Sequence, residues 1–387
     1  LTVSPALTSD RLPLDPRTDD DGGGGGTAGH VLPALAVAEA LVDRGRRADE
    51  ILYAGCKRGI EVRLLPSTPF PAVFYDVVGF QRSLTRRNIA FIPKMITATR
   101  QAIKKFRQDR PAVVVSVGGY ASMPSVFAAR RLKIPVVVVS YDRTPGRASQ
   151  LSAKHAVACA VAFENSLLPR AEVTGAPVRQ AILDVDRAAG RAAARERLGV
   201  GPNRFLVAVM GGSQGSGVLN GAVAKYLADR ADDSELSVRQ VAGERFIDTI
   251  DQVGSGDAHA TGVQHRLIGY EDDMPSVYEA ADLLIGRGGA STVHEVAVTG
   301  TPAILVPWSN AADDHQTDNV GWLTDVEAAV LVPESNLGRL GDEIERLRSD
   351  GGARKQLSDA ALARGDVHRS GALAALIERV ALTSAAS

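Results

Sequence analysis

Gly22-Gly23-Gly24-Gly25-Gly26-Thr27-Ala28-Gly29-His30 continues without a break into residues 31–41, which read VLPALAVAEAL. The second stretch predicts a helix, because its apolar residues fall at helical spacing and alanine is frequent. A glycine loop that opens a helix presents bare backbone N–H groups to an anion, which in α/β proteins is usually a phosphate. A flexible polyglycine linker is the alternative. The ending Thr27-Ala28-Gly29-His30 at the helix start favours the phosphate site.

Composition sets the broad class. A length of 387 residues favours two domains, and a hydrophobic content of 45% is enough for ordinary cores. The formal net charge of -1 provides no global field for nucleic acid, so no such partner is expected. Cys56 and Cys159 form neither a disulfide framework nor a metal-ligand pattern, so we expect a cytoplasmic setting with no metal and no cofactor. No apolar run is long enough to predict a membrane span.

Short apolar runs recur along the chain with helical stretches between them, which is typical of a parallel sheet covered by helices. A first series lies at 51–55, 72–78, 112–117, 134–139, 156–163 and 171–175, and a second at 205–210, 238–243, 265–269, 282–285, 303–307 and 329–333. The sequence therefore predicts two doubly wound α/β halves joined near 177–186, followed by helical patterns at 337–348 and 354–382.

The domain boundaries follow from this series. Residues 1–21 are expected to be a disordered tail, 22–180 and 181–365 the two domains, and 366–387 a C-terminal helix packing back toward the N-terminal domain. One element is missing, because no apolar run comes directly before Gly22. Only residues 1–3 and 12–14 are apolar upstream, so the first half either lacks its first strand or fills the position with a poor substitute.

A second glycine loop, residues 211–216 (GGSQGS), directly follows the predicted strand ending at Met210 and precedes a helix. This context suits a phosphate cradle to which Ser213 can add a hydroxyl donor. A tight turn that needs glycine for its dihedral angles is the alternative. Two loops, each beginning one half, indicate two anionic ligands facing each other across a cleft. A nicotinamide site is disfavoured, because Asp43 and Asp49 do not lie at a strand end.

A third cluster, residues 286–295 (GRGGASTVHE), follows the predicted strand at Asp282. Its small residues let a ligand approach the backbone. Thr292 and Glu295 lie three residues apart on the opening helical turn and share a face. A carboxylate there suits a ribose diol; a solvated helix charge is the alternative.

Seven motifs occur in a fixed order: GTAGH (26–30), VGGY (117–120), GAPVR (175–179), GGSQG (211–215), YEDDM (270–274), RGGASTVHE (287–295) and HQTDN (315–319). Together they resemble the MurG family, the lipid-II-forming N-acetylglucosaminyltransferases of bacterial cell-wall synthesis. The resemblance covers roughly residues 22–382. It implies a GT-B fold, in which two doubly wound Rossmann-like parallel-sheet domains face each other across a cleft.

The resemblance also implies an inverting transfer of GlcNAc from UDP-GlcNAc to the C4 hydroxyl of MurNAc in lipid I. It places the UDP-sugar on Arg179, Ser213, Glu271, Ala290, Ser291, Thr292, Glu295, His315 and Gln316. It places the lipid-linked acceptor on Thr27, Ala28, Gly29, Tyr120 and Asp142. His30 is then the expected general base, because an imidazole titrates near neutrality. A helix-capping or phosphate-contacting histidine is the alternative.

The chain departs from the family pattern on the acceptor side. The family has His-Glu-Gln-Asn where this chain has Val139-Ser140-Tyr141-Asp142, and one of two adjacent donor-site glutamines is His315. A GT-B enzyme acting on another acceptor, or a non-catalytic nucleotide-sugar-binding protein, therefore remains open. Residues 77–96, with Lys104, Lys105 and Arg107, mix apolar and basic residues. With the family resemblance they predict peripheral attachment to the anionic cytoplasmic face of the cell membrane; a solvated helix with a buried apolar side is the alternative.

Overall fold

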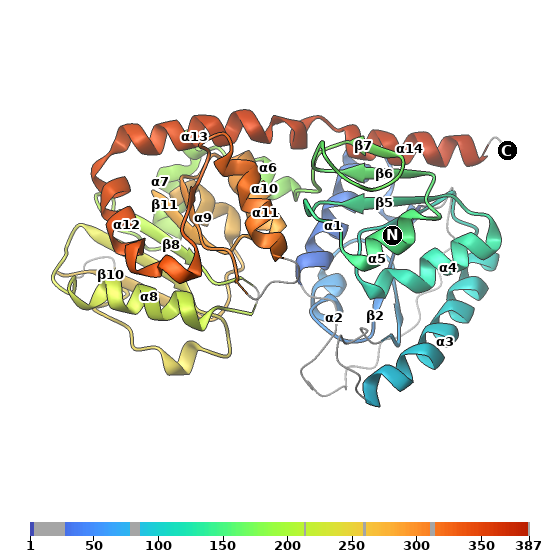
Figure 1. Ribbon diagram of the computed structural model, residues 1–387, viewed down its shortest axis with the longest axis horizontal. Coiled ribbons are helices and arrows are strands. Elements are labelled where there is room, and N and C mark those ends of the chain that lie inside the picture. The colour runs from blue at the N-terminus through green and yellow to red at the C-terminus, as the bar shows by residue number, and fades with distance from the viewer. Residues whose placement is uncertain (4–27, 78–85, 213, 258–260, 310–313, 386–387) are drawn as a thin grey trace. The chain divides into compact units, whose positions relative to one another are not determined.

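The computed structural model describes residues 1–3, 28–77, 86–212, 214–257, 261–309 and 314–385, and Figure 1 shows their helices and strands. They form two compact units, one of Leu1–Arg179 with Ser370–Ser387 and the other of Gln180–Arg369. The chain therefore passes between units within the segment at which the sequence predicts the junction. Residues 366–369, predicted to begin the C-terminal helix, instead form a 3₁₀ turn (η7, Asp366–Arg369) of the second unit.

The first unit contains a seven-stranded sheet in the order β3-β2-β1-β4-β5-β6-β7. Its strands are β1 (Thr2–Val3), β2 (Ile51–Cys56), β3 (Ala72–Tyr75), β4 (Val113–Ser116), β5 (Val136–Ser140), β6 (Ala158–Val161) and β7 (Ala171–Val173). All residues of β4, β5 and β6 are buried, as expected for strands covered on both faces. The order is doubly wound, with the direction of winding reversing between β1 and β4.

β1 fills the position that the sequence left without a strand. Thr2 pairs with both Leu52 and Val114, antiparallel to each, so the strand lies between β2 and β4. The nitrogen of Leu1 donates to the carbonyl of Val115 at 2.9 Å, and the Leu1 side chain is buried. The prediction of a disordered tail over 1–21 is therefore wrong for its first three residues. Residues 4–21 lie outside the described part of the chain.

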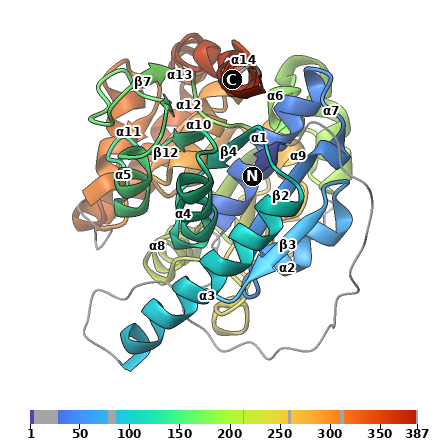
Figure 2. The same cartoon turned by 90° about the vertical axis from the view of Figure 1, so that its right-hand side faces the viewer.

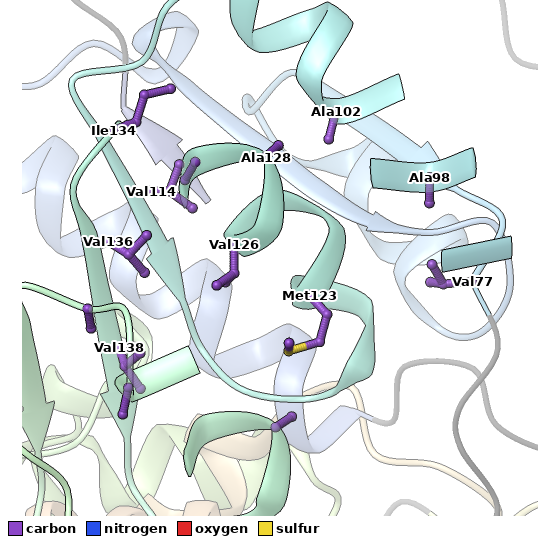
Figure 3. Packing of buried hydrophobic residues seen from close by; sticks show 14 of the residues in the cluster. Val77, Ala98, Ala102, Val114, Met123, Val126, Ala128, Ile134, Val136 and Val138 are labelled. Atoms are coloured by element: carbon purple, nitrogen blue, oxygen red, sulfur yellow. The ribbon is translucent and has the colours of Figure 1, made fainter. Parts of the chain in front are cut away.

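Helices cover this sheet. They are α1 (Ala28–Asp43), α2 (Glu61–Leu64), α3 (Arg86–Gln108), α4 (Met123–Leu132), α5 (Arg147–Ala153) and α14 (Ala372–Ala385). Helices α3 and α4 run side by side (Figure 2). Strand residues such as Val114 and Val136 share a core with Val126 of α4 and Ala102 of α3 (Figure 3). The C-terminal helix α14 packs against α1 and β4.

The second unit contains a six-stranded parallel sheet in the order β10-β9-β8-β11-β12-β13. Its strands are β8 (Phe205–Met210), β9 (Leu236–Val241), β10 (Gln264–Ile268), β11 (Leu283–Gly286), β12 (Ala303–Leu305) and β13 (Val330–Leu331). Its helices are α6 (Gln180–Leu183), α7 (Arg187–Arg197), α8 (Gly217–Ala228), α9 (Met274–Ala280), α10 (Ala290–Thr299), α11 (His315–Thr324), α12 (Leu340–Ser349) and α13 (Gly351–Gly365). The helical pattern at 354–382 is thus divided between α13 and α14, with Gly371 at a φ of +69° before α14.

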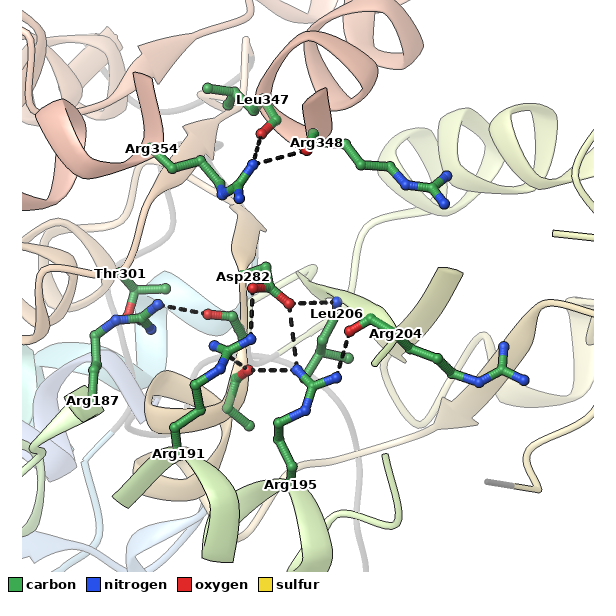
Figure 4. A network of polar contacts seen from close by, with 12 residues as sticks. Arg187, Arg191, Arg195, Arg204, Leu206, Asp282, Thr301, Leu347, Arg348 and Arg354 are labelled. Carbon is green, nitrogen blue, oxygen red and sulfur yellow. Dashed lines mark hydrogen bonds and ion pairs between the residues drawn. The ribbon is translucent and has the colours of Figure 1, made fainter. Parts of the chain in front are cut away.

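Arginines at every fourth position of α7 hold the end of α9 against the second sheet (Figure 4). Arg187 donates to the carbonyls of Tyr278 and Ala281, and Arg191 and Arg195 both donate to that of Ala280. Carbonyls at the end of a helix lack intrahelical partners, so these cations satisfy them. Arg191 also pairs with Asp282 at 2.6 Å. The end of α9 is therefore held rigidly where β11 begins.

Candidate functional site

Glycine-rich loops follow the two central strands of the second sheet. Met210 at the end of β8 pairs with Gly286 at the end of β11, so the loops at 211–216 and 287–289 begin beside each other. Gly215 has a φ of +68°, and a Cβ there would lie 2.1 Å from the carbonyl oxygen of Ala242. These loops lie at the carboxyl edge where the sheet reverses its order, the usual ligand position in such folds.

Arg287 ties the two loops together. Its guanidinium donates to the Ser216 hydroxyl at 2.5 Å and to the Val306 carbonyl at 3.2 Å, and it pairs with Glu334 at 2.7 Å. Ser216 is the N-cap of α8 and accepts a hydrogen bond from the backbone nitrogen of Leu219. Arg287 therefore fixes the start of α8 relative to the loop after β11.

Among the described residues, no side chain caps the backbone donors at the N-terminus of α10. Ala290, Ser291 and Thr292 are its first three residues, and Gly289 at the N-cap has no side chain to cap them. The first N–H groups of a helix have no intrahelical partner and lie at the positive end of its dipole. This arrangement suits a phosphate group.

Glu295 lies one turn further along α10 and is half-buried. Its Oε2 accepts a hydrogen bond from the hydroxyl of Tyr278 on α9 at 2.7 Å. The carboxylate is therefore held in place and is not a freely solvated helix charge.

Glu271 occupies the loop between β10 and α9 with its side chain turned inward. Its carboxylate pairs with Arg239 of β9 at 2.6 Å, and its Oε1 accepts from the backbone nitrogen of Asp273 at 3.0 Å. The side chains of Glu271 and Arg239 are only 6% and 14% exposed. The backbone around Glu271 is consequently fixed.

His315 and Gln316 begin α11 and are half-buried. Gln316 Oε1 accepts from the backbone nitrogen of Trp308 at 2.9 Å. A Cβ on Gly288 would lie 2.7 Å from the Gln316 carbonyl oxygen, so glycine lets α11 approach the loop after β11 closely. These two residues therefore adjoin the same strand end as α10.

Four predicted site residues are described only in part or not at all. Ser213 and Thr27 lie outside the described residues, and Ala28 and Gly29 are the first residues of α1, of which only the backbone is described. Arg179 is the last residue before the chain enters the second unit. It is half-buried, and its Nε has no hydrogen-bond partner among the described residues.

A cavity of about 270 Å³ lies within the first unit, and His30, Tyr120 and Asp142 all line it. The structure therefore brings the expected general base together with two of the residues that the family resemblance assigns to the acceptor. Tyr141, Arg147 and Ser149 also line the cavity, and sequence reasoning did not select them. Tyr141 departs from the family pattern, and Arg147 and Ser149 lie outside the seven motifs. No sequence pattern therefore marks these three residues as part of a site.

His30 lies on the first turns of α1, over the loop that follows β4. A Cβ on Gly119 would be 3.1 Å from His30 Cδ2, and Gly118 and Gly119 have φ angles of +90° and +71°. The Nδ1 of His30 is 2.8 Å from the hydroxyl of Tyr141. Burial lowers the pKa of His30, while the charge of Asp142 and a backbone hydrogen bond with Val117 raise it. The net direction is downward, so the imidazole is neutral near pH 7.

Helix α3 has two contrasting faces. Met95, Ala98 and Phe106 are buried against the core, whereas Ile92 and Ile96 are 64% and 47% exposed. Arg100 and Lys104 continue the exposed row at four-residue spacing and are exposed too. Within the described residues, no helix combines the length and apolarity that crossing a bilayer requires.

Comparison with known proteins gives the family. The glycosyltransferase family 28 N-terminal domain matches residues 23–161, and the family 28 C-terminal domain matches residues 206–370. A UDP-N-acetylglucosamine--N-acetylmuramyl-(pentapeptide) pyrophosphoryl-undecaprenol N-acetylglucosamine transferase from Nitrosococcus oceani is 35% identical over 359 residues, 92% of this chain and 95% of the relative. The transferase of the same name from Cutibacterium acnes is 35% identical over 335 residues, 84% of this chain and 86% of its own.

Solved structures agree. The crystal structure of Acinetobacter baumannii MurG matches with a TM-score of 0.65 and 26% identity, covering 92% of this chain and 97% of that one. A UDP-GlcNAc 2-epimerase from Neisseria meningitidis, solved with UDP-GlcNAc, shares the fold with a TM-score of 0.62 and 11% identity, covering 91% and 97%. The predicted α/β fold class, with two Rossmann-like domains of the GT-B type, is confirmed. The chain therefore belongs to the MurG family within glycosyltransferase family 28.

Proposed function

We propose that this protein transfers GlcNAc from UDP-GlcNAc, with inversion, to the C4 hydroxyl of MurNAc in lipid I, producing lipid II. The observation that carries the proposal is the match to family 28 transferases across both domains, with 35% identity over 92% of the chain. The adjacent glycine-rich strand ends of the second unit support a donor site there.

The donor site is assigned to the second unit. The N-terminus of α10, with Ala290, Ser291 and Thr292, binds the diphosphate, and Ser213 adds a hydroxyl. Glu295 receives the ribose hydroxyls, a role supported by its anchored carboxylate. The fixed backbone at Glu271 receives the uracil edge, and His315 and Gln316 contact the sugar. These roles are assigned residue by residue from the family pattern.

The acceptor site is assigned to the first unit. Ala28 and Gly29 at the start of α1 bind the acceptor diphosphate together with Thr27, which precedes them in the sequence. The cavity lined by His30, Tyr120 and Asp142 takes the acceptor sugar. The acceptor oxygen attacks C1 of GlcNAc as the bond from C1 to the UDP oxygen breaks. His30, neutral near pH 7, takes the hydroxyl proton. The N-terminus of α10 and Arg179 neutralise the charge of the leaving UDP.

The exposed face of α3 is the proposed contact with the anionic cytoplasmic surface of the membrane. Ile92 and Ile96 provide apolar area and Arg100 and Lys104 positive charge on the same face. Basic residues near an anionic leaflet contribute about 1 kcal/mol each. Such attachment places the enzyme beside a lipid-linked acceptor without a membrane-spanning segment.

Transfer is tested with radiolabelled UDP-GlcNAc and a lipid I analogue. We expect labelled lipid II from the wild-type chain and a loss of roughly a hundredfold or more in His30→Ala, typical of removing a general base. No lipid II from the wild-type chain rejects the proposal. A panel of other hydroxyl acceptors distinguishes a transferase with a different acceptor, a question raised by Ser140 and Asp142 in the acceptor cavity. Binding of UDP-GlcNAc without turnover on any acceptor identifies a non-catalytic binding protein.

Membrane contact is tested by co-sedimentation with vesicles of phosphatidylglycerol or phosphatidylcholine. The wild-type chain is expected to sediment with the anionic vesicles, less so at high salt. Ile92→Ser with Ile96→Ser weakens binding. Leu167→Ser is the matched control, because Leu167 is 92% exposed in the same unit but belongs to the loop between β6 and β7. Equal binding by both variants contradicts the assignment.

A further inference from the structure

The Nδ1 side of the His30 ring contacts a tyrosine, Tyr141, that is absent from the family pattern. The Tyr141 hydroxyl lies 2.8 Å from His30 Nδ1, and the two rings meet edge to face with centroids 6.4 Å apart. Tyr141 comes directly after β5, whereas His30 is on α1, so the contact joins positions 111 residues apart. At this position the family has glutamine.

Tyr141 is itself part of a buried polar group. Its side chain is 5% exposed, and burial, with the charges of Asp142 and Tyr53, raises its pKa well above the usual value. The phenol therefore keeps its proton throughout the working pH range. Tyr53 on β2 donates to Glu61 Oε2 at 3.1 Å, and Glu61 Oε1 accepts from the backbone nitrogen of Cys56 at 2.9 Å.

Gly55 makes this group possible. A Cβ at Gly55 would lie 2.3 Å from Glu61 Oε2 and 2.7 Å from Tyr53 Cε1. The absence of a side chain at Gly55 thus lets Tyr53 and Glu61 pack together. Tyr141 is buried, so its side chain has few alternative rotamers and the hydroxyl that faces His30 is preorganised.

The other edge of the imidazole lies over a glycine of the cavity wall. The Cδ2 and Nε2 atoms of His30 lie over Gly119, which lines the cavity, and a Cβ at Gly119 would be 3.5 Å from Nε2. A neutral imidazole has one protonated nitrogen and one acceptor nitrogen. For Nε2 to take a proton from a substrate hydroxyl, the ring proton has to be on Nδ1.

We propose that Tyr141 is a positioning residue that accepts a hydrogen bond from Nδ1–H of His30 and so keeps the Nε2 lone pair directed into the cavity. The inference rests on the proposed role of His30 as general base. When Nε2 takes the acceptor proton, the imidazolium retains its Nδ1–H bond to the tyrosine oxygen, and the negative Asp142 stabilises the cation. The ring therefore need not turn during the reaction.

The test replaces the hydroxyl alone. Tyr141→Phe keeps the aromatic ring, so we expect kcat to fall roughly tenfold or more, less than the hundredfold or more expected from losing the base itself, with KM for UDP-GlcNAc unchanged. Tyr141→Gln, the family residue, is expected to restore part of the rate because its amide oxygen can accept from Nδ1–H. Tyr75→Phe is the matched control, since Tyr75 is equally buried in the same unit and its hydroxyl has no hydrogen-bond partner among the described residues.

A direct readout uses no turnover. In ¹⁵N-histidine-labelled protein, His30→Ala identifies the His30 resonances by their loss. We expect Nδ1 to be protonated in the wild type and the two tautomers to be mixed in Tyr141→Phe, with no change in Tyr75→Phe. A His30 protonated at Nε2 in the wild type, or a Tyr141→Phe variant with wild-type tautomer and kcat, overturns the inference. Failure of the wild type to make lipid II instead rejects the proposed function, whatever the tautomer.

Discussion

Tyr278 on α9 and Glu295 on α10 are joined by a 2.7 Å hydrogen bond that fixes the carboxylate proposed to bind ribose. Removing the hydroxyl in Tyr278→Phe leaves the packing of the ring intact and removes this hydrogen bond from the carboxylate. A hydrogen bond to a charged group contributes about 1.5–3 kcal/mol. We therefore expect KM for UDP-GlcNAc to rise about tenfold, measured by initial rates at saturating acceptor.

The matched control for this prediction is Tyr226→Phe. Tyr226 donates to Glu345 at 2.8 Å in the same unit, on α8 and α12, so it loses the same kind of bond outside the proposed donor site. Its KM is expected to stay at the wild-type value. Equal KM changes in the two variants would mean that Glu295 responds to general loosening of the unit.

The buried ion pair of Arg239 and Glu271 predicts that losing one partner destabilises the protein more than replacing both. Glu271→Ala leaves the guanidinium buried without its carboxylate, which costs about 3–5 kcal/mol. Replacing both residues, in Arg239→Met with Glu271→Leu, removes both charges and is expected to regain most of the unfolding free energy. Urea denaturation followed by circular dichroism measures both.

Asp359→Ala serves as the comparison for that pair, because Lys355 and Asp359 form an ion pair with exposed side chains on α13. Exposed pairs contribute about 0–1 kcal/mol, so its denaturation midpoint should barely move. A double variant of Arg239 and Glu271 that is no more stable than Glu271→Ala would contradict the account.

The Asp142 carboxylate predicts a shift in the pH profile. Burial lowers the pKa of His30, and the charge of Asp142 opposes this effect. The base is active when neutral, so the acidic limb of kcat/KM is expected below pH 6.5. Asp142→Asn removes the opposing charge, so the limb should move to still lower pH. A limb that moves upward, or one that persists in His30→Ala, would assign it to another group.

The buried imidazole of His265 leads us to expect that the second unit loses stability at acidic pH. The backbone nitrogen of Val253 donates to its Nδ1, so its Nε2 is protonated and donates to Gln240, which donates in turn to Asn220 on α8. Burial lowers the pKa of His265 to about 4. The unfolded chain binds this proton below pH 6.5 and the folded one does not, so stability is lost as the pH falls from 6.5 toward 4.

The expected loss over that range is about 3 kcal/mol. His265→Gln cannot titrate, so its unfolding free energy should depend less on pH than that of the wild type by this amount. Urea midpoints measured at pH 7, 6, 5 and 4.5 give the comparison. Parallel curves for the two proteins would show that His265 is protonated equally in both states.

Most of the sheet architecture could be predicted because many strands are continuous apolar runs, and β4, β5 and β6 are buried along their whole length. β1 could not, since two residues carry no periodicity and its hydrogen bonds come from partners about 50 and 112 residues away. Arg287 lies within the motif at 287–295, but its bonds to Ser216 and Glu334 join residues distant in sequence, which no local pattern predicts.

The site shows the same division. Glycine loops and helix starts gave the positions of Ala290 to Thr292, because local sequence determines backbone donors. Tyr141 and Arg239 act through partners that folding brings close, and no local pattern marks them. The sequence contains Gly371 between α13 and α14, but it does not mark this glycine as a break, because helical spacing continues on both sides.

The first unit is assembled from distant segments of the chain, and this affects how it folds during synthesis. The second unit is one continuous segment, Gln180–Arg369, whereas the first needs β1 from one end of the chain and α14 from the other. Domains generally fold as units in the order in which a ribosome releases them. Here the domain that begins first is completed last, because α14 is translated only after the whole second unit. Until then, the nascent first unit exposes the surfaces of α1 and β4 that α14 later covers.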